Sequence, residues 1–138
     1  MTSRHAAIVF GRLALAAGFL SAVADRFGLW GPPGSPRVAW GDWVHFVAYT
    51  GTLNWFVPSA VVMPLALAAT VAELALAVWL LTGYKLHWSA RASGALLLAF
   101  GTTMTVALGI KAPLDYSVFA AAAAAFLLGT SVPPTPAR

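Results

Sequence analysis

A single acidic residue, Glu73, interrupts the apolar stretch that runs from residue 58 to residue 82. This stretch has about the length that an α-helix needs to cross the hydrocarbon core of a bilayer. A carboxylate is costly there unless it is paired, hydrogen-bonded, protonated or exposed to water. Such a group could bind a polar headgroup, relay protons, or form an ion pair that only holds neighbouring helices in register.

Two arginines are the predicted partners of Glu73. At about 1.5 Å per residue, Glu73 lies roughly 14 Å from the carboxyl end of its helix, and Arg12 lies roughly 9 Å from the same side of the membrane. Arg91 lies in the first turn of a later helix on that side. We therefore predict an intramembrane charge cluster of Arg12, Glu73 and Arg91. In the alternative, Arg12 extends to the membrane surface and leaves Glu73 protonated.

A second group of polar and aromatic side chains gathers at the opposite ends of the helices. Donors, acceptors and a flat apolar wall would suit a quinone or a lipid headgroup, although ordinary solvated loop residues would give the same pattern. This candidate headgroup or quinone pocket consists of Asp25, Arg26, His45, Tyr49, Asn54, Lys111, Asp115 and Tyr116.

The composition is that of an integral membrane protein. Hydrophobic residues make up 60% of the 138 positions and charged residues only 9%, against about 25% charged in an ordinary soluble domain. We therefore expect a single transmembrane domain over residues 1–138, with the lipid bilayer as its surroundings. The net charge of +4 comes from scattered basic residues, which argues against binding of nucleic acid.

Cysteine is absent from the sequence. This excludes disulfides, thiol redox chemistry, iron–sulfur ligation and thiolate zinc sites within the chain. The three histidines are predicted to lie apart, so we expect no metal site and no covalently bound cofactor.

Hydrophobic runs and breakers predict an all-α membrane bundle of four helices, over residues 6–24, 58–82, 89–110 and 116–130. The segment GPPGSP at 31–36 cannot continue a helix. After it, residues 40–52 read as a short interfacial helix between the first two crossings, with Asp42 as its N-cap. Four of the six tryptophans lie in this connection, as expected at the headgroup level. They are Trp30, Trp40, Trp43 and Trp55.

Small residues predict two packing faces. The neighbours of Glu73 at three- and four-residue steps are all small, so this side should pack against another helix. They are Ala66, Ala69, Thr70 and Ala77. In the first helix, Ala14, Gly18 and Ala22 form a similar stripe.

The amino-terminal segment also resembles a signal peptide with an exit at Ala22 and Ala24. Lysine and arginine counts near the helix ends place both termini in the cytoplasm.

Four segments together resemble the DoxX family of small four-helix bacterial membrane proteins: RLALAAGFLSAVADRFGLWG, FVAYTGTLNWFVP, TVAELALAVWLLTG and GIKAPLDYSVFAAAAAAFLL. The shared pattern consists of Arg12, Asn54, Pro58, Glu73, Tyr116 and Ser117.

This resemblance implies a four-helix bundle in the bacterial inner membrane, with an uncleaved first helix. It also implies an accessory or anchor subunit of a membrane oxidoreductase system, not catalytic on its own, with other oxidoreductase subunits as partners and a quinone as a possible ligand. The alternative is a non-redox membrane module, either a small-molecule transporter or a structural subunit of a larger membrane complex.

Overall fold

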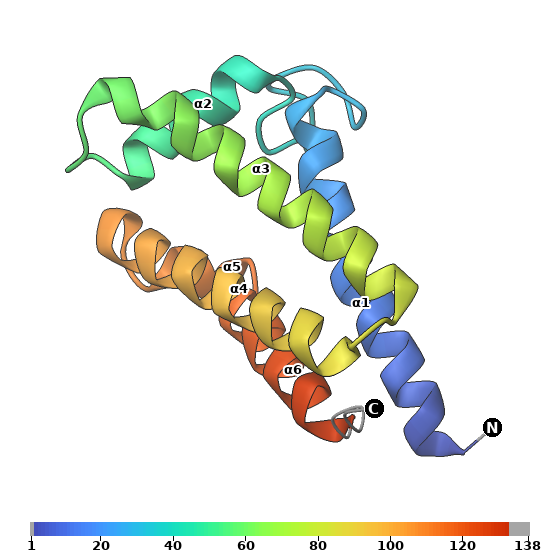
Figure 1. Cartoon of the computed structure of the whole chain (residues 1–138). Coiled ribbons are helices and arrows are strands. Elements are labelled where there is room, and N and C mark those ends of the chain that lie inside the picture. The colour runs from blue at the N-terminus through green and yellow to red at the C-terminus, as the bar shows by residue number, and fades with distance from the viewer. Residues whose placement is uncertain (1, 133–138) are drawn as a thin grey trace.

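The structure is a computed structural model that describes residues 2–132, and its regular secondary structure is entirely helical over that range. Three helices, α1, α3 and α4, are long and apolar enough to cross a membrane, so the chain is a multi-pass membrane protein. The elements, shown in Figure 1, are α1 (Ser3–Arg26), α2 (Trp43–Leu53), α3 (Ser59–Thr82), α4 (Leu86–Leu108), α5 (Lys111–Asp115) and α6 (Val118–Ser131).

The predicted helix boundaries differ from those of the structure mainly at the end of the first helix and in the segment before the last one. The first helix extends to Arg26 instead of ending near residue 24, and residues 111–115, which lie between the last two predicted helices, form the short helix α5. The predicted fourth crossing corresponds to α6, which has 14 residues. At about 1.5 Å per residue this helix is roughly 21 Å long, less than the roughly 30 Å of a hydrocarbon core.

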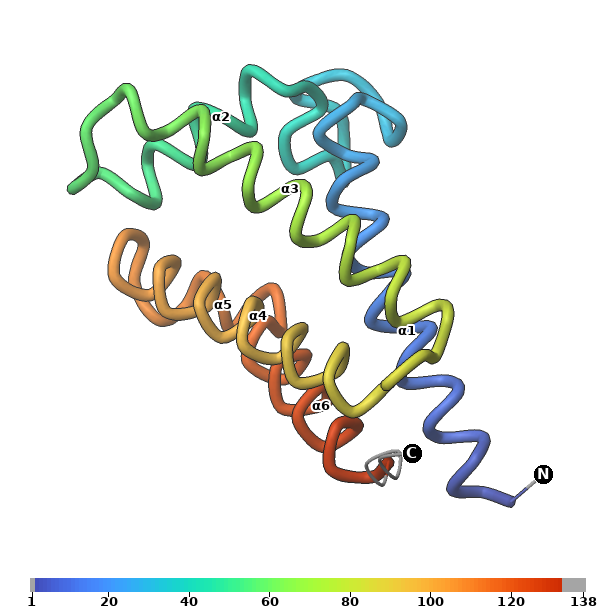
Figure 2. The backbone as a smooth tube through the Cα atoms, viewed as in Figure 1, coloured from blue at the N-terminus to red at the C-terminus, as the bar shows by residue number. Residues whose placement is uncertain are grey.

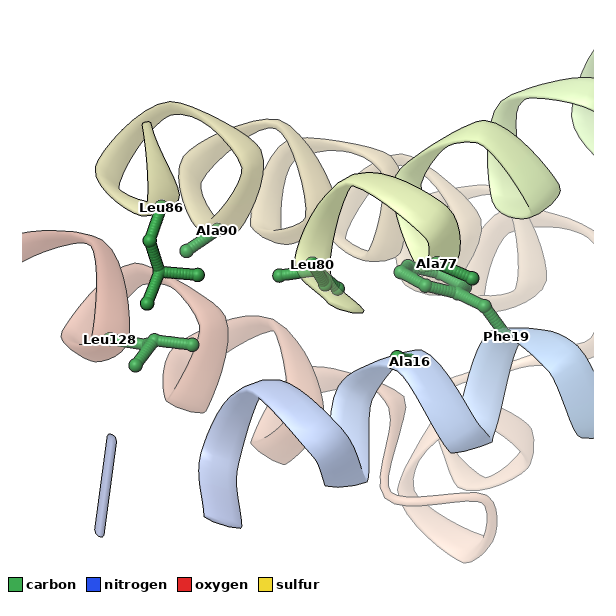
Figure 3. Close-up of a cluster of buried hydrophobic side chains, with 7 residues drawn as sticks. All are labelled: Ala16, Phe19, Ala77, Leu80, Leu86, Ala90 and Leu128. Carbon is green, nitrogen blue, oxygen red and sulfur yellow. The ribbon is translucent and has the colours of Figure 1, made fainter. Parts of the chain in front are cut away.

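The helices form two pairs. Helix α1 packs along α3, and α4 packs along α6, while α2 lies beside the first half of α3. Figure 2 shows that the start of α1, the α3–α4 connection and the end of α6 lie at the same end of the molecule. The two pairs meet through a hydrophobic core near that end (Figure 3), made of Ala16, Phe19, Ala77, Leu80, Leu86, Ala90 and Leu128.

Glycines allow the close contact between α4 and α6. A Cβ atom on Gly101 would lie 2.6 Å from a ring carbon of Phe119, and one on Gly129 would lie 2.8 Å from Cγ of Arg91. Side chains of normal size do not fit at either position, so the approach of these helices depends on the missing Cβ atoms.

The structure confirms one predicted packing face and contradicts the other. The buried residues of α3 follow a single stripe of Ala66, Thr70, Glu73, Ala77 and Leu80, as the small neighbours of Glu73 predicted.

The stripe of small residues in α1 is not its buried face: Ala14 and Gly18 are exposed and Ala22 is only partly buried. Gly18 is exposed, and a Cβ atom there would have nothing within 4 Å. Helix α1 instead turns Ala16 and Phe19 inward. A large aromatic side chain beside an alanine fills this contact better than the small residues would.

Candidate functional site

A buried charge pair joins the end of α1 to the middle of α3. Arg26, the last residue of α1, forms an ion pair through Nη2 with Oε2 of Glu73. Its Nη1 donates a hydrogen bond of 2.7 Å to Oγ1 of Thr70, one turn earlier on α3. Arg26 is 2% exposed and Glu73 is 4% exposed. Both charges are therefore shielded from solvent, and each provides the counter-ion that makes burial of the other tolerable.

Aromatic rings from the α1–α2 connection and from α2 cover this pair. The guanidinium carbon of Arg26 lies 3.8 Å from the ring centroid of Phe46 and 5.4 Å from that of Trp40. Trp40 and Phe46 contact each other edge to face, with centroids 5.0 Å apart. A cation over a ring face is attracted by the ring quadrupole, more strongly where water is excluded. The aromatic cover thus stabilises Arg26 while it shields the ion pair.

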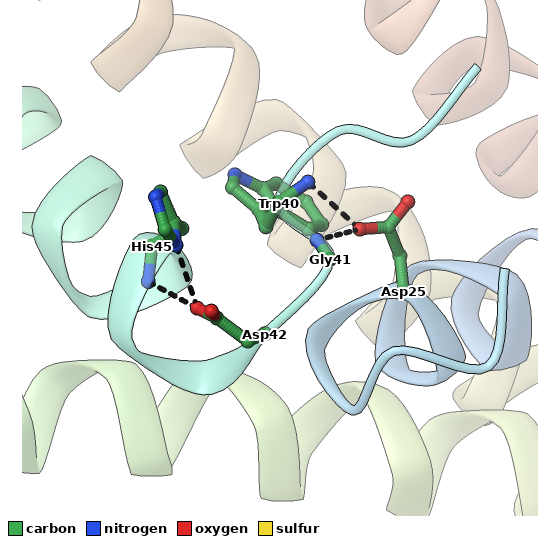
Figure 4. Close-up of polar contacts among 5 residues, drawn as sticks. All are labelled: Asp25, Trp40, Gly41, Asp42 and His45. Atoms are coloured by element: carbon green, nitrogen blue, oxygen red, sulfur yellow. Dashed lines mark hydrogen bonds and ion pairs between the residues drawn. The ribbon is translucent and has the colours of Figure 1, made fainter. Parts of the chain in front are cut away.

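Asp25, next to Arg26, holds the connection in place. Its carboxylate accepts hydrogen bonds from the backbone N–H groups of Ala39 at 2.9 Å, Trp40 at 2.8 Å and Gly41 at 2.9 Å. Figure 4 shows the Asp25 carboxylate facing the Trp40–Gly41 backbone. One buried carboxylate therefore fixes the position of Trp40 over the neighbouring arginine.

The predicted partners of Glu73 are wrong, because the structure pairs Glu73 with Arg26 in place of Arg12 or Arg91. The prediction estimated the depth of each charge from the helical rise per residue. It assumed that the helices are parallel and that their ends lie at the same level in the membrane. Instead, the first half of α3 extends past the end of α1 beside α2. This offset places Glu73 level with the last residue of α1.

Arg12 and Arg91 lie elsewhere in the bundle. The Arg12 guanidinium approaches Gly83 in the α3–α4 connection so closely that a Cβ atom there would collide with Nη1. The Arg91 guanidinium carbon lies 5.9 Å from the ring centroid of Trp88, and its side-chain stem packs over Gly129. The predicted cluster of three charges is therefore not assembled.

The candidate headgroup or quinone pocket comes together only in part. Asp25 and Arg26 are buried and engaged as described above. Asn54 donates a hydrogen bond of 2.9 Å to the backbone carbonyl of Thr50, and Lys111 pairs with Asp115 at 2.5 Å on the surface. All five residues are engaged within the chain: Arg26 with Glu73 and Thr70, Asp25 and Asn54 with the backbone, and Lys111 with Asp115.

His45 belongs to the cap of α2. The Asp42 carboxylate accepts a 2.8 Å hydrogen bond from the His45 backbone N–H and lies 2.8 Å from its ring Nδ1. This confirms Asp42 as the predicted N-cap (Figure 4). The backbone N–H of His45 holds the pKa of the Asp42 carboxyl below its usual range.

Tyr49 and Tyr116 keep their hydroxyl groups available at this end of the molecule. The Tyr49 ring lies 5.6 Å from that of Trp40. Burial raises the pKa of Tyr49, and Tyr116 is near enough to raise it further. Tyr116 itself is 71% exposed. Of the predicted pocket, these two phenols are the part that could contact a ligand, and the Trp40 ring, which was not predicted there, lies beside Tyr49.

The contribution of Trp40 and Phe46 to the charge site is the feature that sequence reasoning missed. Trp40 had been attributed to the membrane interface, together with the other tryptophans of this connection. One signal was present: Phe46 and Thr50 lie four positions apart, on one face of a helix, and they are the buried residues of α2. The site connects three helices: the buried ion pair joins α1 to α3, and Phe46 of α2 packs over its arginine. No group of three or more metal-binding side chains occurs among the described residues.

Comparisons with protein-family models, with curated proteins and with solved structures found no match to this chain.

Proposed function

We propose that this chain is an accessory or anchor subunit of a membrane oxidoreductase system, as the resemblance to the DoxX family implies. In this proposal α5 and α6 together form the fourth crossing, and α2 lies at the membrane surface. The protein resides in the bacterial inner membrane with both termini in the cytoplasm. It works with catalytic subunits and not alone.

One observation carries this proposal: each of the four acidic side chains is already engaged within the chain. Asp25 binds backbone N–H groups, Asp42 caps α2, Glu73 pairs with Arg26 and Asp115 pairs with Lys111. A general acid or base must be able to reach a substrate. Because these four carboxylates hold the fold together, they are not free to act on a substrate. This favours an accessory subunit whose catalytic groups belong to a partner protein.

A quinone is the ligand that this role implies, and it would supply reversible electron acceptance. The described residues fit it only at the face formed by Trp40, Tyr49 and Tyr116, where a flat ring meets two phenols. Asp25 and Arg26 do not fit, since their polar atoms are buried in internal contacts. We therefore assign quinone contact to the two tyrosines and Trp40.

A purely structural subunit is the second candidate, and the enclosure of the Arg26–Glu73 pair favours it over a transporter. A transport route past Glu73 would require this carboxylate to meet water or substrate. At 4% exposure and paired with Arg26, it meets neither.

Purification from the native membrane in a mild detergent tests the proposal. Mass spectrometry should find redox-protein subunits with the wild-type chain, and solvent extraction should recover a quinone. Tyr49→Phe should lower quinone recovery without releasing the partners. A complex without any redox protein would support the structural subunit, and a chain that purifies alone would refute both candidates.

A further inference from the structure

A cavity opens at the end of the molecule opposite the aromatic cover. It has a volume of about 450 Å³ and is lined by residues from the start of α1, the α3–α4 connection and the end of α6. Its lining contains five basic side chains and no acidic one. The basic residues are Arg4, His5, Arg12, Lys85 and His87.

The positive charge of this cavity has no side-chain counter-ion in the described part of the chain. The four carboxylates of the sequence are engaged with Lys111, Arg26, His45 and the backbone of the α1–α2 connection. Three basic side chains, Arg4, Arg12 and Lys85, therefore line one space without an acidic partner, although Arg4 donates a hydrogen bond to the Ser131 carbonyl and Nζ of Lys85 lies 5.4 Å from the ring centroid of Tyr84. Like charges that line a low-dielectric recess attract a soluble or lipid-borne anion.

Two buried nitrogen atoms in the lining have no hydrogen-bond partner among residues 2–132. They are Nε of Arg12 and Nδ1 of His87. His87 is 6% exposed, so water does not readily satisfy its ring. Buried polar atoms without partners are rare in folded proteins, and both of these belong to residues that line the same cavity.

The backbone is adapted to bring Arg12 into this position. Gly83 adopts a φ of 69°, and any side chain there would collide with the Arg12 guanidinium. Lys85 follows with a φ of 44°, an unusual conformation for a residue with a side chain. The connection thus passes close to the Arg12 guanidinium at Gly83 and places Lys85 in the lining of the same cavity.

We propose that this cavity binds a phosphate group, with Arg12 and Lys85 as its principal ligands and His87 as an additional hydrogen-bonding group. Guanidinium and ammonium groups bind phosphate oxygens through charge-assisted hydrogen bonds. The cavity lies at the ends of membrane-crossing helices, which is the depth of lipid headgroups. The phosphate can therefore come from an anionic phospholipid or from free phosphate. The site does not rest on the oxidoreductase role, because it uses other residues at the other end of the bundle.

Lipid binding measured by native mass spectrometry tests this proposal. The full-length protein is released from detergent micelles that contain phosphatidic acid, phosphatidylglycerol or phosphatidylcholine. Wild-type protein should retain one anionic lipid with about tenfold or greater preference over phosphatidylcholine. Arg12→Gln and Lys85→Gln should each lower this preference several-fold. Lys111→Gln, which removes an exposed cation at the opposite end, should leave it unchanged.

A second arm distinguishes the source of the phosphate. Inorganic phosphate is added to the protein in neutral detergent, and the thermal midpoint is compared with that in an equal ionic strength of chloride. A phosphate-specific rise that disappears in Lys85→Gln, without lipid preference, would assign free phosphate as the ligand.

The absence of both lipid preference and phosphate stabilisation would overturn the proposal. Loss of preference in Lys111→Gln equal to that in Lys85→Gln would do the same, since it would indicate non-specific attraction. Lys85 is exposed, so its variant tests the site even where Arg12→Gln fails to fold. Co-purification of partners is unaffected by these outcomes, so failure here and failure of the proposed function are distinguishable.

Discussion

Removal of Glu73 should destabilise the bundle far more than removal of Glu73 together with Arg26. Glu73→Met leaves the Arg26 guanidinium 2% exposed, with one hydroxyl and two aromatic rings as its remaining contacts. Breaking a buried pair in this way costs about 3–5 kcal/mol, because the surviving charge stays desolvated. Replacing both residues by methionine removes the charges together and should return stability to within about 1 kcal/mol of wild type.

The two single variants should also differ from each other. Arg26→Met leaves a carboxyl group that can take up a proton and become neutral. A guanidinium has no such escape, since it stays protonated in proteins. We therefore expect Arg26→Met to lose less stability than Glu73→Met, and the difference to grow as the pH is lowered.

Reversible unfolding in mixed micelles, with sodium dodecyl sulfate as the denaturant and tryptophan fluorescence as the signal, measures these free energies. The double-mutant cycle should give a coupling of about 3 kcal/mol or more. The exposed pair Lys111–Asp115 is the matched control, with side chains 83% and 56% exposed. Its variants should change stability by about 0.5 kcal/mol or less. Equal losses in Glu73→Met and in the double variant would refute the argument, because the surviving charge would then cost nothing.

Three further predictions follow from the loops and helix contacts. Asp25→Ala should cost about 1–3 kcal/mol for its unpaired N–H groups, and limited proteolysis should then cleave residues 31–38 faster. Gly101→Ala should lower stability by about 1–3 kcal/mol in thermal melts because its Cβ would lie 2.6 Å from an aromatic carbon; Gly18→Ala, which faces open space, should not. The pKa of Asp42 is lowered from 3.8, so its cap stabilises α2 fully above that pH and is lost as pH falls through the lowered value. Hydrogen-exchange protection at the start of α2 should show this loss in wild type but not in Asp42→Asn, whose amide caps without titrating.

Local patterns predicted what depends on local chemistry. The small residues one turn either side of Glu73 identified the buried face of α3. A short acidic side chain before an apolar run identified Asp42 as the cap of α2. In both cases the residues that decide the outcome lie within four positions of each other, so helix periodicity was sufficient.

The partner of Glu73 depends on how two helices are offset, and no periodic pattern records that offset. Depth counting assumed helices of equal tilt, which favoured Arg12. The decisive features were the extension of α1 to Arg26 and the path of α3 beside α2. The role of Asp25 was likewise hidden, because its three N–H donors lie 14 to 16 residues later in a segment without periodicity.

The location of Arg26 at the end of α1 sets an order on biogenesis. Its hydroxyl partner, Thr70, is made 44 residues later, and Glu73 follows within the same turn of helix. During synthesis, α1 therefore enters the bilayer while its terminal guanidinium still needs water or lipid phosphate. The charge can be buried only when α3 has left the ribosome and inserted beside it. Enclosure of the Arg26 charge is thus a late step in maturation, which has to wait for the insertion of α3.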